Sequence, residues 1–197
     1  MKQSFNTLLR FSGLIAAILA WIVIGVSVYY NSWFAFNVNA FSDLGGPKAT
    51  NPWIYNHGLI VTAIFVIMYS LYLILDSLNK LETVGGSFIF IAGIFLSLIG
   101  IYHAGTRPHV FVSTWFFIQM DLAILTYGLG LVLEKIKHYG IISIMLSIIG
   151  PIIAAIIRWP SVAMMEVYGI LIIDIWVFLM IKVHHLHLKN DIHVRNV

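Results

Sequence analysis

The sequence contains no cysteine and few charged residues. The absence of cysteine excludes disulfide bonds, thiolate metal sites and a cysteine nucleophile. Only 10% of the 197 residues are charged, whereas a soluble domain carries roughly a quarter. A disordered chain is excluded as well, because it would be poor in large apolar residues. The protein is therefore expected to lie in a lipid bilayer.

Apolar residues make up 60% of the sequence and occur in long runs. A helix that crosses the hydrocarbon core needs about 20 mostly apolar residues. Six segments meet this requirement: residues 12–30, 58–75, 86–103, 111–133, 139–157 and 161–181. The predicted fold class is all-α, a six-helix transmembrane bundle that forms one integral membrane domain over residues 1–197, with both termini cytoplasmic. Because most connections are short, consecutive helices should be antiparallel neighbours.

The orientation follows from the 11 Lys and Arg residues. One side of the predicted topology holds most of them: Lys2, Arg10, Lys80, Lys135, Lys137, Lys182, Lys189 and Arg195. The other side holds Lys48, Arg107 and Arg158. Cytoplasmic loops carry the excess of basic residues, so the first side is predicted to be cytoplasmic in a multi-pass protein of the cell membrane.

The basic residues also indicate which partners to expect. They lie at the ends of the spans and form no basic patch, which argues against nucleic acid as a partner. The cytoplasmic tail 182–197 is basic and rich in histidine. Such a tail favours contact with anionic membrane lipids.

One connection, the outer loop 31–56, is much longer than the others. It contains Gly45, Gly46, Pro47 and Pro52, which are turn-forming residues that do not fit inside a regular element. Long loops in compact proteins are often lids or binding loops. We therefore expect this loop to form a lid or one wall of a site.

Three acidic residues lie where the bilayer should not tolerate them. Asp121 falls near the middle of the fourth span, Glu166 about one turn into the sixth, and Asp174 deeper in the sixth. An acid at the bilayer centre costs about 2.5–3.5 kcal/mol on insertion scales, so such residues should face the protein interior. They could be functional, or they could be hydrogen-bonding groups between helices. The sequence leaves both interpretations open.

A second group of polar residues is predicted to share the outer mouth of the bundle: Asp43, Lys48, His57, His103, Arg107, His109, Arg158 and Glu166. His57, His103 and His109 lie at one predicted depth and could bind zinc with one coordination position open for water. In that hydrolytic version Asp43 or Glu166 would be the general base.

The same mouth allows two other interpretations. Lys48, Arg107 and Arg158 could bind a lipid headgroup or a small anion, since guanidinium groups match phosphate and carboxylate. All these groups could also form a merely structural polar rim. Bis-histidine haem b is disfavoured, because it needs two facing histidines inside the hydrocarbon and no histidine lies in mid-span. The identity of any cofactor stays open, with zinc as the metal to test.

Two short motifs resemble a known family. The stretch Phe41-Ser-Asp-Leu-Gly45 precedes Asn51-Pro-Trp-Ile-Tyr-Asn-His-Gly58 at the start of the second span. This pattern resembles the polytopic membrane family catalogued as domain of unknown function 998 (DUF998). The resemblance implies about six spans and a polar, histidine-containing turn between the third and fourth, here at residues 100–109. It implies no activity.

Two classes of function are consistent with the sequence. The first is a membrane protein whose outer-mouth site binds a lipid headgroup or small anion, with metal-assisted hydrolysis as a variant. The second is a non-catalytic accessory subunit that packs against partner membrane subunits. Small residues such as Gly93, Gly100, Gly128 and Gly130 suit close contacts between helices in either case. The sequence does not decide whether the protein is an enzyme.

Overall fold

The protein is a bundle of long helices. The computed structural model describes the backbone of residues 2–195 and the side chains of residues 7–183. In that part the chain forms no strand and six α-helices: α1 (Lys2–Tyr30), α2 (Pro52–Leu75), α3 (Lys80–Ile101), α4 (His109–Leu133), α5 (Lys137–Ile156) and α6 (Val162–Arg195). Each helix contains a stretch long and apolar enough to cross a membrane. The predicted all-α, six-span fold is confirmed.

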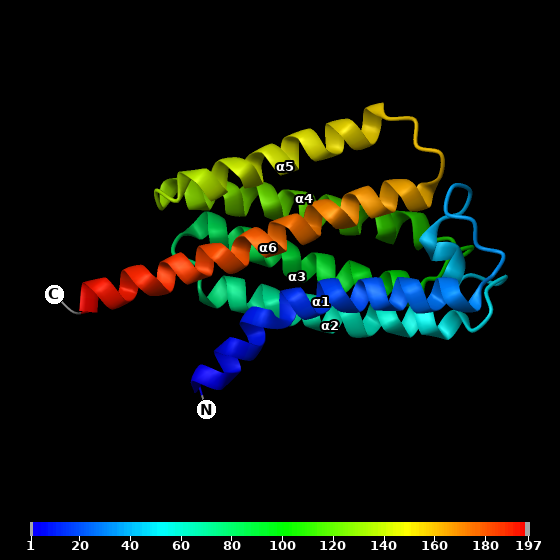
Figure 1. Ribbon diagram of the computed structural model, residues 1–197, viewed down its shortest axis with the longest axis horizontal. Coiled ribbons are helices and arrows are strands. Elements are labelled where there is room, and N and C mark those ends of the chain that lie inside the picture. The colour runs from blue at the N-terminus through cyan, green and yellow to red at the C-terminus, as the bar shows by residue number, and fades with distance from the viewer. Residues whose placement is uncertain (1, 196–197) are drawn as a thin grey trace.

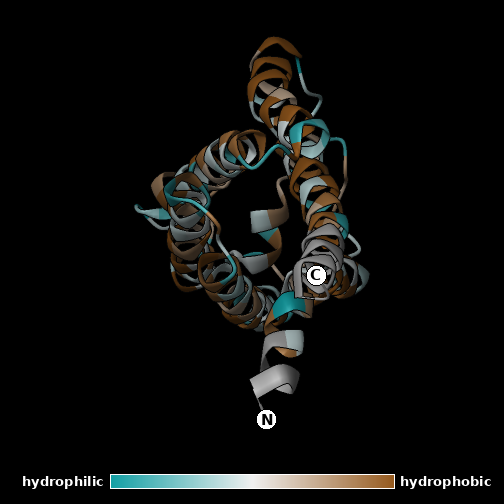
Figure 2. Ribbon diagram, turned by 90° about the vertical axis from the view of Figure 1, so that its left-hand side faces the viewer, coloured by the Kyte–Doolittle hydropathy of each residue, from teal (hydrophilic) through white to brown (hydrophobic). Residues whose placement is uncertain are grey.

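Five of these helices form a ring. Consecutive helices from α1 to α4 pack side by side, and α6 closes the ring between α4 and α1. Helix α5 lies outside the ring, against α4 and α6 (Figure 1). In the end-on view hydrophobic residues dominate the helices (Figure 2), as expected of surfaces that face lipid.

The two ends of the bundle differ. Both termini lie at one end (Figure 1), which we call the terminal end. The opposite end carries the long connection between α1 and α2, so we call it the capped end. That the terminal end is cytoplasmic stays a prediction.

Glycines bring neighbouring helices close together. A Cβ atom placed on Gly93 of α3 would lie 2.6 Å from Ile67 of α2, and one on Gly128 of α4 would lie 2.8 Å from the Cβ of Ser143. Real Cβ atoms do not approach so closely, so a larger residue at either position would push the helices apart. Small residues at helix contacts are typical of membrane bundles.

Two helix boundaries differ from the prediction. Helix α2 begins at Pro52 rather than at residue 58, because proline fits the first helical position, where its missing N–H costs nothing. Helix α6 continues to Arg195 instead of ending at 181, and residues 182–195 contain no glycine or proline to stop it. The prediction that the tail contacts lipids depends on side chains outside the described part of the chain.

The connection between α1 and α2 folds over the ring as a cap, residues 31–51. Asn31 holds both ends of the cap: its Nδ2 donates to the carbonyl of Ser27 at 2.8 Å, and its Oδ1 accepts from the N–H of Thr50 at 2.6 Å. A short 3₁₀ helix, η1 (Phe41–Gly45), lies within it. The predicted long loop is thus an ordered cap with hydrogen-bonded ends.

The cap is also attached to α6. Ser161 Oγ donates to the carbonyl of Phe36 at 2.7 Å, and the backbone N–H of Ala163 donates to the carbonyl of Asn39 at 3.0 Å. These two bonds fix the start of α6 beneath the cap. Because α6 also closes the ring, the cap and the ring closure are joined at one place.

Candidate functional site

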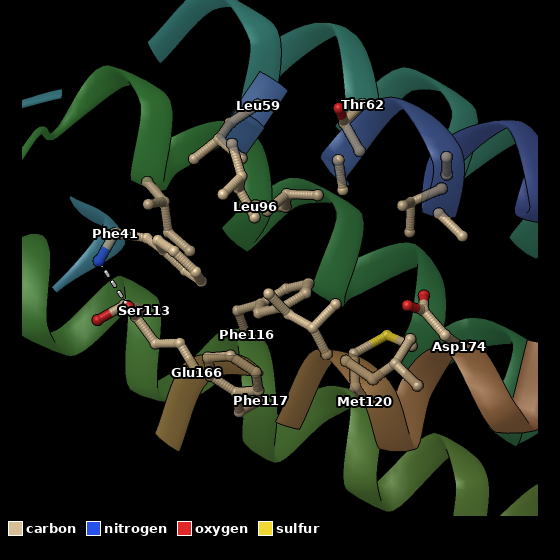
Figure 3. A pocket seen from close by; sticks show the side chains of 18 of the residues that line it. Phe41, Leu59, Thr62, Leu96, Ser113, Phe116, Phe117, Met120, Glu166 and Asp174 are labelled. Atoms are coloured by element: carbon tan, nitrogen blue, oxygen red, sulfur yellow. Dashed lines mark hydrogen bonds between the residues drawn. The ribbon is translucent and has the colours of Figure 1, made fainter. Parts of the chain in front are cut away.

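A cavity lies inside the ring beneath the cap. Its volume is about 120 Å³, and its walls come from α1, α2, α3, α4, α6 and η1. Most of the lining side chains are apolar, among them Leu59, Leu96, Phe116 and Met120 (Figure 3). An apolar cavity of about 150 Å³ is large enough to bind benzene. This space can therefore hold a slender apolar group.

Small residues on α1 create much of this space. Gly13, Ala16, Ala17 and Ala20 all line the cavity. They follow one another at intervals of three, one and three residues, which places them on a single face of the helix. Leucine or phenylalanine at these positions would fill the space that the other helices leave open.

Glu166 lies at the capped end of the cavity. Its Oε2 accepts a hydrogen bond from the backbone N–H of Phe41 at 2.8 Å, which joins α6 to η1 (Figure 3). No second hydrogen bond to this carboxylate is formed within the described part of the chain, so Oε1 remains available. Glu166 thus supports the cap and offers one acceptor to the cavity.

His109 lies at the same end, at the start of α4. The turn between α3 and α4 reverses tightly, with Gly105 in the left-handed region at a φ of 91°. This reversal places the Nδ1 of His109 at 2.7 Å from the carbonyl of Tyr102. A carbonyl oxygen can only accept, so Nδ1 carries the proton and Nε2 of the neutral ring is an acceptor.

Hydroxyl groups complete the capped end. Tyr55 of α2, Ser113 of α4 and Ser42 of η1 line the cavity there. Asp43 belongs to η1, and Glu166 accepts a hydrogen bond from Phe41 of the same short helix, so both acids lie near this part of the site. Among the lining residues that the structure describes, none is Lys or Arg. The capped end is therefore acidic and able to form several hydrogen bonds.

Asp174 lies deeper in the cavity. It is eight residues beyond Glu166 on α6, or about 12 Å along the helix axis, and apolar side chains line the space between the two acids (Figure 3). Its Oδ2 accepts from Trp21 Nε1 of α1 at 2.8 Å. This bond joins two helices of the ring. Asp174 is thus a hydrogen-bonding group between helices, one of the two interpretations that the sequence left open.

Two buried polar atoms near this depth lack partners. Tyr69 and Trp176 line the cavity, and within the described residues neither the Tyr69 hydroxyl nor Trp176 Nε1 makes a hydrogen bond. Buried polar groups in native proteins almost always have a partner. A bound molecule could therefore form hydrogen bonds with the Tyr69 hydroxyl and with Trp176 Nε1.

The three predicted zinc ligands do not come together. His109 faces the cavity, whereas His57 lies in a separate surface groove between α1 and α2, beside Tyr30 and Trp53. The Nδ1 of His103 lies 2.9 Å from the carbonyl of Ala104. Within the residues described, no three His, Asp or Glu side chains form a group that could hold a metal ion. The convergence expected from the sequence is absent there because His57 and His109 face different ways.

The other residues predicted for the outer mouth have different surroundings. Lys48, Arg107 and Arg158 are exposed and do not line the cavity. Asp43 Oδ2 accepts from the backbone N–H of Ala40 at 2.9 Å, inside the cap. Asp121 is partly exposed on α4 and lies outside the cavity. Of the predicted set, Glu166, His109 and Asp174 line one common space.

Several lining residues were not predicted from the sequence. The small residues of α1 carried a usable signal, because Gly13, Ala16, Ala17 and Ala20 share one helix face. Tyr55 and Leu59 of α2 lie four residues apart and line the same wall. That periodicity marks an inward face, but it does not distinguish a filled core from a hollow one.

Comparison with known proteins identifies a family whose function is unknown. A family model described as "Protein of unknown function (DUF998)" matches residues 14–182, which include all of the cavity-lining helix segments from Ala16 onward. No curated protein matches the chain, and no solved structure does.

Proposed function

The chain belongs to the DUF998 family of proteins of unknown function, a membership that carries no activity with it, and we propose from the cavity that the protein binds a slender amphiphilic molecule inside its bundle. The apolar part of the ligand would occupy the space between α1, α4 and α6. Its polar group would lie at the capped end, beside Glu166 and His109. The observation that carries this proposal is the mostly apolar cavity that has Glu166, His109 and several hydroxyl groups together at its capped end.

The arrangement favours a ligand taken from a membrane. The cavity lies within helices long enough to cross a bilayer, and one of its walls, α6, is the helix that closes the ring. A smaller share of α6 than of α2, α3 or α4 is buried inside the protein. A wall with few buried contacts is the part of a bundle that separates most readily, so α6 is the expected route for a lipid chain.

The proposal is one of binding and includes no hydrolytic step. The hydrolase hypothesis required His57, His103 and His109 to share a zinc ion, and the described side chains provide no such group. The anion hypothesis required the outer arginines to line the site. Arg107 and Arg158 are exposed outside the cavity. Of the residues predicted for the outer mouth, Glu166, predicted as a general base, and His109, predicted as a zinc ligand, line the cavity, and the proposed binding uses these two.

Binding of hexanol to the protein in lipid nanodiscs tests this proposal, with empty nanodiscs measuring simple partition. One saturable site per chain is expected. The Ala16→Leu and Ala20→Leu variants should bind about tenfold more weakly or worse, because added side-chain volume in a small cavity costs about 1–3 kcal/mol. Ala155→Leu, on the exposed surface of α5, is the matched control and should bind like the wild type. Absence of saturable binding would contradict the proposal.

Asp121 favours a second candidate, a subunit of a larger membrane complex. It lies at the middle of α4, is partly exposed, and forms no hydrogen bond with another described residue. A mid-membrane acid needs a partner or must be neutral, and a neighbouring membrane helix could supply a donor. Extraction in mild detergent should then yield a complex that the Asp121→Leu variant no longer forms. If the wild-type protein always migrates alone, the subunit hypothesis fails.

A further inference from the structure

The hydrogen-bonding groups at the capped end of the cavity are mainly acceptors. Glu166 Oε2 accepts from the Phe41 N–H, and Oε1 of this cavity-lining residue forms no hydrogen bond with another described residue. His109 donates through Nδ1 to the carbonyl of Tyr102, so Nε2 is an acceptor when the ring is neutral. The lining hydroxyls of Tyr55 and Ser113 can donate or accept. A ligand that satisfies this set must bring hydrogen-bond donors.

The charges at this end also select among polar groups. Glu166 lines the cavity, and Asp43 lies in η1, the short helix to which Glu166 is hydrogen-bonded through Phe41. Lys48 of the cap and Arg107 of the turn before α4 are exposed on the surface. A phosphate or carboxylate would meet acids with no positive side chain on the described walls, and a charge buried without a partner is strongly disfavoured. A cation would find its partner in Glu166.

We infer, on the basis of the proposed function, that the ligand is an amphiphile whose polar group is a primary amine. An ammonium group has three donors and no acceptor, which fits the two acceptors, Glu166 Oε1 and His109 Nε2, and one hydroxyl. With Glu166 the amine forms a pair that is neutral overall, whichever partner holds the proton. A hydroxyl group offers one donor and no charge, so it satisfies the site only in part.

A series of probes with one hexyl chain and different polar groups tests this inference. Binding of hexylamine, hexanol and hexanoate is measured on the full-length protein in nanodiscs, with partition into empty nanodiscs subtracted. Hexylamine should bind at least about tenfold more tightly than hexanol, since hydrogen bonds to charged groups are worth roughly 1.5–3 kcal/mol. Hexanoate should bind more weakly than hexanol. Methylamine, which lacks the chain, should bind about a hundredfold more weakly than hexylamine or worse, because each buried CH₂ contributes about 0.8 kcal/mol.

The Glu166→Gln variant tests whether the preference for hexylamine depends on the charge of Glu166. A glutamine side chain keeps a carbonyl oxygen that can accept from the Phe41 N–H, so the cap stays attached while the charge is lost. The preference for hexylamine over hexanol should fall to nearly none. Arg158→Gln removes an exposed charge outside the cavity and should leave the preference intact.

The outcomes separate this inference from the function on which it rests. If hexanol and hexylamine bind equally well, or hexanoate binds best, the amine inference is overturned and the cavity remains a binding site. A preference for hexylamine that survives in Glu166→Gln also overturns it. If no probe of the series binds saturably, the proposed function itself fails.

Discussion

Asp43 lies in the cap with its carboxylate bonded to backbone: Oδ2 accepts from the Ala40 N–H at 2.9 Å. The sequence placed Asp43 among the candidates for a general base. If its role is to hold the turn, Asp43→Asn should change the free energy of unfolding little, because the amide oxygen still accepts. Asp43→Ala should cost about 1 kcal/mol. Thermal unfolding of the purified protein measures both.

A binding measurement on the same variants separates charge from structure. Hexanol affinity should be unchanged in Asp43→Asn, which keeps the cap in place. Loss of binding in a stable Asp43→Asn variant would show that the negative charge itself is needed, contrary to the structural role. The exposed cap residue Asn37 provides the control, since Asn37→Ala removes a side chain of similar size and should have no effect on either quantity.

The sequence predicted well which residues lie at the capped end and poorly which way they face. Depth follows from position along a span, and so His57 and His109 are both at that end. Direction follows from helix phase. Tyr55 and Leu59 line the cavity, and His57, two residues from each, is turned by about 200° to the outer surface. Without knowing which face of α2 is inward, the sequence could not separate the two histidines.

At the scale of helices, the contact between α4 and α5 depends on Gly128. A Cβ there would lie 2.8 Å from the Cβ of Ser143 and 3.0 Å from the carbonyl oxygen of Gly140. Backbone atoms cannot move aside as the end of a flexible side chain can. Gly128→Leu should therefore lower the free energy of unfolding by about 1–3 kcal/mol, measured by thermal unfolding. Gly25→Leu, where nothing lies within 4 Å, should be neutral within about 0.5 kcal/mol.

The bond between α1 and α6 allows a double-mutant cycle. Trp21 Nε1 donates to Asp174 Oδ2 at 2.8 Å, and hydrogen bonds between membrane helices contribute about 0.6 kcal/mol on average and up to about 1.7. The coupling between Trp21→Phe and Asp174→Leu in unfolding measurements should fall in that range. Trp21→Phe and Asp121→Leu, which lie on α1 and α4, should be additive within about 0.5 kcal/mol. Equal coupling in both cycles would contradict a specific bond.

The helices themselves were predictable because long apolar runs have few alternatives in a membrane. The residues at which the helices begin and end were harder to predict. Proline is typical of loops, and the sequence therefore placed Pro52 in the outer loop. In the structure Pro52 is the first residue of α2, because proline is as compatible with the first helical turn as with a loop. The position of α5 outside the ring could not be predicted, since all six spans are similarly apolar and their order around a bundle depends on contacts between distant segments.

For the molecule as a whole, the orientation in the membrane is the prediction that most affects the proposed function, because it decides which side the cap faces. Eight of the 11 Lys and Arg residues belong to the terminal end of the predicted topology, which predicts an extracytoplasmic cap. The absence of cysteine gives a direct test, since the wild-type chain offers no thiol to a maleimide. Single substitutions Ser32→Cys and Asn37→Cys in the cap, and His138→Cys at the terminal end, leave the Lys and Arg count unchanged.

In intact cells an impermeant maleimide should label Ser32→Cys and Asn37→Cys, and it should label His138→Cys only after permeabilisation. All three positions are exposed, so a difference in labelling reports the side of the membrane and not burial. The reverse pattern would place the cap in the cytoplasm, and the ligand would then come from the inner leaflet. Because Glu166 and His109 lie at the capped end of the cavity, this one measurement fixes the side of the membrane on which the polar group of the ligand is held.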